Sequence, residues 1–249
     1  MRKLLIRADD FGFSEGVNYG IAKTVYDGLI QNVGLMPNME AATHGVSLLR
    51  GTKVCLGQHT NLCVGKPISD PALIPSLVEE NGEFKAATQY RTAGRDIVVL
   101  EEAIIEVEAQ YRRFVELTGE QPRYFEGHAI MSPNFFRALK TIAQRHDLPY
   151  LEFGQNLTCR FRNAQLVGIM ESMQPKYDPY AALNRAVMGG WGENIYPMLV
   201  CHPGYIDDYL MTHGILIQPR PKEVTMLCDP SVAKWLEQQN VKLITYDDL

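Results

Sequence analysis

Two adjacent aspartates, Asp9 and Asp10, end a short apolar run near the start of the chain. Aspartate is depleted in strands and neighbouring carboxylates repel each other, so the pair favours a place beside a cation, most simply a metal ion. Three histidines, His59, His128 and His202, end other strand-like runs. A carboxylate with two neutral imidazoles suits Zn, Fe, Mn, Co or Ni better than an ion that takes oxygen ligands only. Such an ion polarises a carbonyl and lowers the pKa of a bound water, whose proton a second carboxylate can take.

The runs that carry these residues alternate with helical patterns, which is typical of an α/β barrel with about eight parallel strands. In such a barrel the catalytic groups lie at the carboxyl ends of the strands. The four strand ends that carry the aspartates and histidines should therefore meet at one mouth. We expect strands near residues 3–9, 31–36, 53–59, 123–128, 149–153, 165–170, 197–202 and 241–246.

Helix signals separate these strands. Ser14 can cap a helix that ends near Gly28, because apolar residues recur between them at helical spacing. Gly119 is a stop signal for the longest helix. The other helices are expected over Asp96–Thr118, from Pro133 to Arg145, and from Asp229 onward.

Length and composition fit one barrel domain over residues 1–249. The chain has 249 residues, of which 46% are hydrophobic, and this suits a single well-cored α/β barrel. Residues 65–94 lack sustained periodicity and are interrupted by prolines and glycines, so we expect a long loop or lid there. The formal net charge of −5, without a Lys/Arg cluster, disfavours nucleic acid or an anionic membrane as a partner and favours a small-molecule substrate.

The five cysteines are odd in number and show no CxxC spacing, so neither a disulfide framework nor a zinc finger is indicated. The first apolar run is too short for a signal peptide and is followed at once by two acids. No later run approaches the length of a membrane span. These features predict a cytoplasmic protein with free thiols, and we keep a homodimer as one possible assembly.

Motifs distributed over nearly the whole chain resemble one known family. They are Ala8-Asp9-Asp10-Phe11-Gly12-x-Ser14, Leu35-Met36-x-Asn38, Gly57-x-His59, Gly127-His128 and Cys201-His202-Pro203-Gly204-Tyr205. Together they resemble the YdjC-like carbohydrate deacetylases, the family of chitooligosaccharide deacetylase. The resemblance implies a TIM-like barrel that removes acetyl groups from N-acetylated sugars with one divalent metal ion. Mg and Zn are the leading candidates for that ion.

The resemblance also implies a role for each matching residue. Asp9 would be the catalytic base, His202 the catalytic acid, and Asp10, His59 and His128 the metal ligands. A catalytic acid of this kind should be cationic near neutral pH, which a nearby carboxylate would favour. The residues expected to contact the substrate are Trp191, Tyr205 and Arg7.

The chain departs from the family pattern at three places. Arg7 stands where the family usually has Asn, and Gln31-Asn32-Val33 replaces a Val-Thr-Ser run. Glu126-Gly127-His128 replaces an Asp-Ser-His motif that is followed by further histidines. Because the first histidine is retained, metal binding should survive. The other differences change the lining of the cleft, so one alternative is a divergent subfamily that acts on another acylated substrate.

Other interpretations remain open. An isolated Asp more often caps a helix, and a lone His at a strand end is more often structural. Two adjacent aspartates together with three histidines at strand ends disfavour these explanations for the whole set. Trp191 lies in a Gly-rich turn and could simply be packed there. Arg220 and Glu223 are expected to begin a helix, and a role in orienting the site is the alternative.

Two other functions are also kept: a sugar-binding or regulatory homologue that retains the metal without turnover, and a metal-dependent phosphoesterase. The intact Asp9 and His202 disfavour the first. The lack of a Gly-rich phosphate cradle and of ligands for a second metal disfavours the second.

Overall fold

The computed structural model describes residues 1–154, 158–192 and 194–249. Within these ranges, nine strands form one sheet in the order β4-β3-β2-β1-β8-β7-β6-β5, and β9 pairs with β1 as a branch. The strands are β1 (Arg2–Phe11), β2 (Asn32–Leu35), β3 (Cys55–Thr60), β4 (Phe125–Gly127), β5 (Leu151–Phe153), β6 (Thr158–Phe161), β7 (Ala164–Ile169), β8 (Ile195–Cys201) and β9 (Val241–Ile244). The helices are α1 (Glu15–Tyr26), α2 (Ala42–Leu48), α3 (Ala87–Thr92), α4 (Leu100–Thr118), α5 (Pro133–His146), α6 (Pro179–Met188), α7 (Asp208–His213), α8 (Pro219–Leu227) and α9 (Pro230–Gln238).

The two ends of this strand order come together. Phe125 of β4 donates its backbone N–H to the carbonyl of Pro149 at 2.9 Å and forms a parallel bridge with Tyr150, just before β5. The sheet is therefore a nearly closed barrel of eight strands, which confirms the expected TIM-like α/β barrel. The barrel is irregular, because β6 runs antiparallel to both of its neighbours whereas the pairs formed by β1, β2, β3, β4 and β8 are parallel.

The eight expected strands all exist, but they are not the eight strands of the barrel. The last of them, β9, is the branch on β1, and β6 was missed. A tight turn joins β6 to β7, and Arg162 adopts a left-handed conformation there, with φ 51°. Arginine is a poor sequence signal for such a turn, because glycine or asparagine usually supplies a positive φ.

The expected helix boundaries agree closely with the structure. Ser14 caps α1 by accepting the N–H of Val17 at 3.2 Å, and Ser132 and Asp229 cap α5 and α9 in the same way. The longest helix, α4, begins at Leu100 rather than Asp96. It ends at Gly119, whose φ of 77° matches the expected stop.

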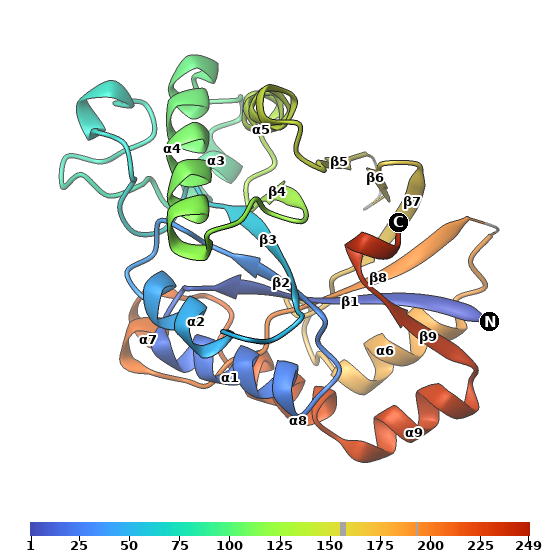
Figure 1. Cartoon of the computed structure of the whole chain (residues 1–249). Helices are drawn as coiled ribbons and strands as arrows, with labels where there is room; N and C mark the ends of the chain where they lie inside the picture. Colours follow the sequence, from blue (N-terminus) through green and yellow to red (C-terminus); the bar gives the residue numbers. More distant parts are fainter. Residues whose placement is uncertain (155–157, 193) are drawn as a thin grey trace.

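Side chains of β1 alternate between two cores. Leu4, Ile6 and Ala8 pack with α1, α6, α8 and α9, which lie together on one side of the sheet (Figure 1). Leu5 belongs to the core inside the barrel, whose other members include Tyr124, Phe161 and Tyr246. Because Arg7 and Asp9 follow Leu5 at spacings of two, they also face the barrel interior, directly above this apolar core.

Residues 65–94, expected to be a long loop or lid, contain a short 3₁₀ turn at Pro71–Leu73 and α3. Their buried side chains Ile74, Leu77 and Phe84 pack in the core formed by α4 and α5. Glu106 of α4 ties the segment down by accepting the backbone N–H groups of residues 68 and 69. The helices of the described ranges are all too short or too polar to cross a bilayer.

Candidate active site

A local irregularity in β1 brings both aspartates to the site. Ala8 pairs with Val33 and Phe11 with Leu35, so three steps along β1 match only two along β2. Asp10 adopts φ 71° within this bulge. In a regular strand adjacent side chains point to opposite faces, whereas a bulge can turn both toward the same site. Aspartate tolerates the left-handed conformation better than most residues, which fits its use here.

Asp10 meets two histidines from neighbouring strands. Its Oδ1 atom lies 3.4 Å from Nε2 of His59, at the end of β3, and 3.2 Å from Nδ1 of His128, just after β4. The same two imidazole nitrogens are 2.9 Å apart. Asp10 Oδ1 is buried and has no hydrogen-bond partner within the described ranges. Three atoms with lone pairs thus face one another, and together they fit a divalent cation.

Two of these ligands, His59 and Asp10, are each held by a further charged residue. Glu126 of β4 makes a very short contact with Nδ1 of His59 and thereby leaves Nε2 directed at Asp10. A carboxylate on the outer nitrogen is the usual way in which a metal-binding histidine is oriented and its tautomer fixed. On the other side, Arg220 of α8 donates to Oδ2 of Asp10 at 2.6 Å, which leaves Oδ1 for the cation.

Arg7 compensates the charges beneath this group. Its Nη2 donates to Asp9 at 2.7 Å and lies 3.4 Å from Glu126, while Nη1 donates to Tyr246 at 3.2 Å. Asp9, His59 and Glu126 could also be ligands of a metal by distance alone. However, the guanidinium already supplies the positive charge to both carboxylates, so a metal fits better beside Asp10.

The pKa shifts reflect these pairings. Burial opposes ionisation of Asp10, but Arg220 and His128 beside it hold the pKa of that carboxyl well below its usual range. Burial likewise opposes a charge on His128, but Asp10 raises its pKa to about 9. His59 behaves similarly: against the effect of burial, Glu126 and Asp9 raise its pKa well above the ordinary value. The group is thus strongly attractive to positive charge, carried either by protons or by a metal ion.

His202 follows β8 and approaches the same group from a fourth strand. Burial lowers its pKa to about 4, and Arg220 and His59 act in the same direction against Asp10 and Asp9. The imidazole is therefore neutral near pH 7. The expectation of a cationic acid is wrong for this structure, because desolvation and neighbouring positive charges outweigh the carboxylates.

The expected substrate contacts are distributed differently. Arg7 is at the site, but only 3% of its surface is exposed and its guanidinium serves Asp9 and Glu126 rather than the cleft. Tyr205 follows His202 in the loop after β8 and is 39% exposed, with its backbone bonded to Gly16.

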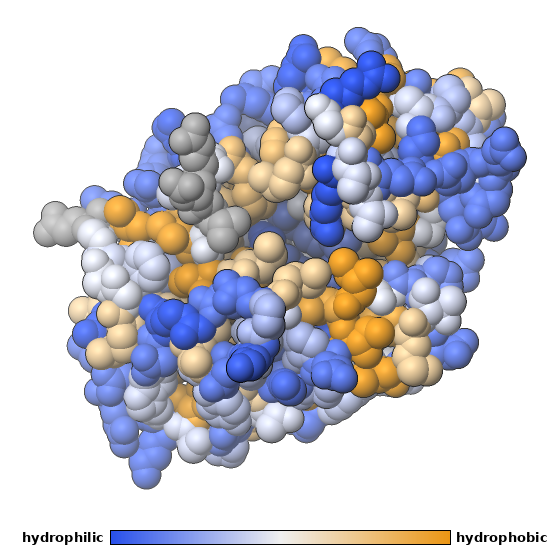
Figure 2. Space-filling model, turned by 180° about the vertical axis from the view of Figure 1, so that it is seen from behind, coloured by the Kyte–Doolittle hydropathy of each residue, from blue (hydrophilic) through white to orange (hydrophobic). Residues whose placement is uncertain are grey.

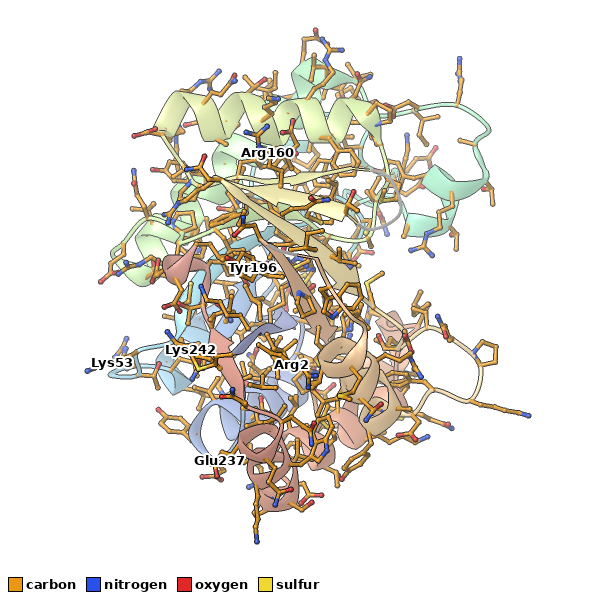
Figure 3. The ribbon with its side chains drawn as sticks, turned by 90° about the vertical axis from the view of Figure 1, so that its right-hand side faces the viewer. Arg2, Lys53, Arg160, Tyr196, Glu237 and Lys242 are labelled. Atoms are coloured by element: carbon orange, nitrogen blue, oxygen red, sulfur yellow. The ribbon has the colours of Figure 1, made fainter. Side chains whose placement is uncertain are left out.

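Trp191 does not reach the site. Its indole N–H donates to the carbonyl of Ala186 at 2.7 Å, and it lines a pocket with Arg2, Lys3 and Tyr196. That pocket lies at the amino-terminal end of β1, which faces the viewer in Figure 3. The eight residues that separate Arg2 from Asp10 span roughly 25 Å in an extended strand. The expected contact of Trp191 with the bound sugar is therefore wrong for this cleft, because the connection between α6 and β8 that carries Trp191 lies at the opposite end of the barrel. The alternative, an indole packed in a Gly-rich turn, is confirmed.

Sequence reasoning missed the role of Glu126, which was noted only as a departure from the family motif. For Arg220 and Glu223 it preferred the start of a helix over a role in orienting the site, and the structure shows both: the two residues lie in α8 and contact Asp10 and His202. Glu223 is fully buried and accepts the backbone N–H of His202. A weak signal existed, since a fully buried charged residue in a helix needs a partner, but burial is not visible in the sequence.

The mouth around these residues is partly apolar. Seen from behind, the molecule is hollowed near the centre of its surface, and hydrophobic side chains gather beside the hollow (Figure 2). Exposed apolar residues follow the carboxyl ends of three barrel strands: Met131 after β4, Met170 and Met173 after β7, and Ile206 and Ile215 after β8.

Comparisons with known proteins agree with the motifs. The model of the family described as "YdjC-like protein" matches residues 3–238. The chain is 32% identical over 252 residues to the carbohydrate deacetylase of Geobacillus stearothermophilus, covering 98% of this chain and 97% of the relative. It is 28% identical over 260 residues to the chitooligosaccharide deacetylase of Escherichia fergusonii, covering 100% and 99% of the two chains.

A solved structure shares the fold. It is a putative cellobiose-phosphate cleavage protein from Enterococcus faecalis V583, with a TM-score of 0.83 at 22% identity, and the likeness covers 99% of this chain and 98% of that one. The family match extends over nearly all of the barrel and includes the two aspartates and three histidines of the site. The resemblance expected from the motifs is thus confirmed, and the chain belongs to the YdjC-like protein family.

Proposed function

We propose that this chain removes acetyl groups from N-acetylated sugars and that Asp10, His59 and His128 hold one divalent metal ion for the reaction. The observation that carries the proposal is the buried Oδ1 of Asp10, which has no hydrogen-bond partner among the described residues and faces two imidazole nitrogens at 3.4 and 3.2 Å. The names of the relatives from Geobacillus stearothermophilus and Escherichia fergusonii supply the substrate class. The ion's identity, a cytoplasmic location and a homodimer stay predictions.

A bound divalent ion would act as a Lewis acid toward the acetyl carbonyl and would lower the pKa of a water molecule. The chain's own residues would handle the proton. Asp9 has one oxygen paired with Arg7, and its Oδ1 is buried without a partner among the described residues, so it can accept a proton from water. Asp9 is thus the proposed base, as expected from the sequence.

His202 is proposed to contact the acetyl group or the departing nitrogen. Its backbone is fixed by Glu223 and by Arg220, whose Nη1 lies 3.4 Å from the His202 carbonyl. A fixed imidazole N–H can stabilise negative charge that develops on the acetyl oxygen. Tyr205, further along the same loop, is proposed to contact the sugar.

Phosphoester hydrolysis fits these residues less well. A two-metal phosphoesterase needs two sets of ligands, whereas the two possible ligand groups of the described residues share His59. Arg7 and Arg220, the buried arginines of the site, are both engaged by carboxylates and offer little to a phosphate group.

The test is acetate release from a panel of N-acetylated chitooligosaccharides, before and after treatment with a chelator and again after Zn or Mg is restored. We expect acetate release that is lost with the metal and regained with it. His59→Ala should lose the metal, whereas His213→Ala, an exposed residue of α7, should keep it. Acetate release that survives complete metal removal would refute the metal role, and phosphate release without acetate would favour the phosphoesterase.

A further inference from the structure

His202 has a second neighbour that the proposed function does not use. Its Nδ1 atom lies 3.1 Å from Oγ of Ser172, a residue with 2% of its surface exposed. Ser172 follows β7, so a fifth strand contributes to the site from its carboxyl end. With Glu223 on the backbone N–H of His202, this contact fixes both the position of the residue and the orientation of its ring.

The segment that carries Ser172 is anchored on both sides. Glu171 is paired with Nε of Arg185 in α6 at 2.9 Å. Tyr177 donates its hydroxyl to Glu223 at 2.8 Å, the same carboxyl group that holds the His202 backbone. The segment that carries Ser172 is therefore fixed. Glu223 holds both this segment, through Tyr177, and the backbone of His202.

The environment of Ser172 decides which way its hydrogen bond runs. Within the described ranges, the hydroxyl has this single hydrogen bond. If Nδ1 of His202 carried the proton and donated it, the buried serine O–H would be left without an acceptor, which costs free energy. If the hydroxyl donates to Nδ1 instead, no buried donor is wasted, and the imidazole proton resides on Nε2.

We propose that Ser172 is a positioning residue that holds His202 as the neutral tautomer protonated at Nε2, so that His202 donates a hydrogen bond to the substrate and keeps its proton. This inference rests on the proposed function, since it assigns the state in which the proposed His202 works. It also implies that Asp9, and not His202, delivers the proton that the departing nitrogen takes up.

The proton balance is then simple. Asp9 takes a proton from water while the water oxygen forms a bond to the acetyl carbon. The carbon–nitrogen bond breaks, and the proton held by Asp9 passes to the departing nitrogen. The products are the amino sugar and acetic acid, which ionises to acetate, and His202 ends the cycle with the proton with which it began.

The charges around His202 are consistent with a neutral ring. Arg220 of α8 and His59 of β3 disfavour its protonation, as does burial, whereas Asp9 and Asp10 of β1 favour it. Glu223, buried near it, has its pKa raised to about 7 by burial and so carries only part of a negative charge near neutral pH. A serine on Nδ1 adds no charge, whereas a carboxylate there would stabilise the imidazolium ion.

The experiment is nitrogen-15 NMR of the histidine side chains in the full chain at pH 7, with His202 assigned by its loss in His202→Gln. We expect a protonated Nε2 and an unprotonated Nδ1 in the wild type. Ser172→Ala should mix the two tautomers and lower kcat by about 10-fold, the factor for one ordinary hydrogen bond. Ser47→Ala, which changes an exposed serine of α2, should alter neither readout.

Ser172→Asp should move the proton to Nδ1 and raise the pKa of His202, so that a new fall in kcat appears as the pH rises through that pKa. A wild-type His202 that is protonated at Nδ1, or at both nitrogens, at pH 7 would overturn the proposal whether or not the variants fold. Acetate release by the same wild-type sample is measured separately, and its absence would instead refute the proposed function.

Discussion

The two ends of the barrel differ in how they combine charge and burial. At the carboxyl end of β1, Asp9 and Asp10 are almost fully buried and meet arginines and histidines from other elements. At the amino end, Arg2 is exposed, and Lys3 lies 5.2 Å above the ring of Tyr196. This end faces the viewer in Figure 3, where Arg2, Tyr196 and Lys242 lie near one another around the ends of β1, β8 and β9.

The amino end has a pocket of about 480 Å³ whose lining includes Trp191. At the carboxyl end, the side chains of Asp10, His59 and His128 converge on one point. Charges at the amino end remain hydrated and cost little. Those at the carboxyl end have been taken out of water, and such burial is tolerated only where every charge has a partner or a function. The comparison teaches that buried, mutually compensated charges mark the site here better than a pocket with an aromatic wall does.

The largest expected effect separates the two aspartates of the carboxyl end. Asp9→Asn should keep the metal and lose kcat by roughly 10²–10⁴-fold, as for the loss of an acid–base group. Asp10→Asn should weaken both metal binding and turnover, because Asp10 Oδ1 faces both imidazoles. Metal content and acetate release are measured on both variants. If Asp9→Asn lost the metal and Asp10→Asn retained it, the two roles would have to be exchanged.

A smaller effect is expected from Glu126, which contacts the outer nitrogen of His59. Glu126→Gln can still accept a hydrogen bond but loses the charge, and we expect metal affinity to fall by about 10- to 100-fold. Glu152→Gln, which changes an exposed glutamate of β5, is the matched control. Calorimetric titration with Zn gives both affinities, and an unchanged value for Glu126→Gln would show that this carboxylate does not support the ligand.

Metal affinity should also depend on pH. In the metal-free protein the pKa of His128 is raised to about 9, so its proton must leave before the ring can bind a metal. Affinity should therefore rise by at least about 10-fold per pH unit from pH 6 until the pH approaches 9.

The sign for stability is the opposite. Because its pKa is raised on folding, His128 stabilises the metal-free protein below its ordinary pKa, and this contribution is lost as the pH rises through about 9.

The prediction for metal affinity is tested by titrations with Zn at pH 6, 7 and 8. A constant affinity over this range would mean that His128 is not a ligand.

The smallest effect is expected at the amino end. Trp191→Ala removes an indole that packs on α6, so it should lower the melting temperature. It should leave kcat/KM for the acetylated sugar within about 2-fold, since the pocket that Trp191 lines lies at Arg2, roughly 25 Å from Asp10 along β1. A loss of kcat/KM comparable with that of Asp9→Asn would erase the distinction between the two ends.

The sequence was sufficient to predict the strand ends that meet. Apolar runs that end in Asp10, His59, His128 and His202 indicated four barrel strands, because side chains at carboxyl ends of parallel strands share one edge. What could not be predicted is how each ligand is held. Arg220 contacts Asp10 although the two residues are 210 positions apart in the chain, and no local sequence pattern indicates that contact.

The two errors about residue roles have a common origin. Trp191 was expected in the cleft because its type suits sugar binding. His202 was expected to be cationic because it was assigned as the catalytic acid, a state that a nearby carboxylate would favour. Both depend on the surroundings of the side chain, namely the end of the barrel for Trp191, and burial and Arg220 for His202. Residue type limits the chemistry that is possible, whereas packing decides which of it occurs.

The most direct test is anomalous diffraction from a crystal of the full chain that has been loaded with Zn. We expect one strong peak among Oδ1 of Asp10, Nε2 of His59 and Nδ1 of His128, with Arg7 still paired to Asp9 and Glu126. A peak among Asp9, Nδ1 of His59 and Glu126 instead, with Arg7 displaced, would contradict the assignment of the ligands and of the base.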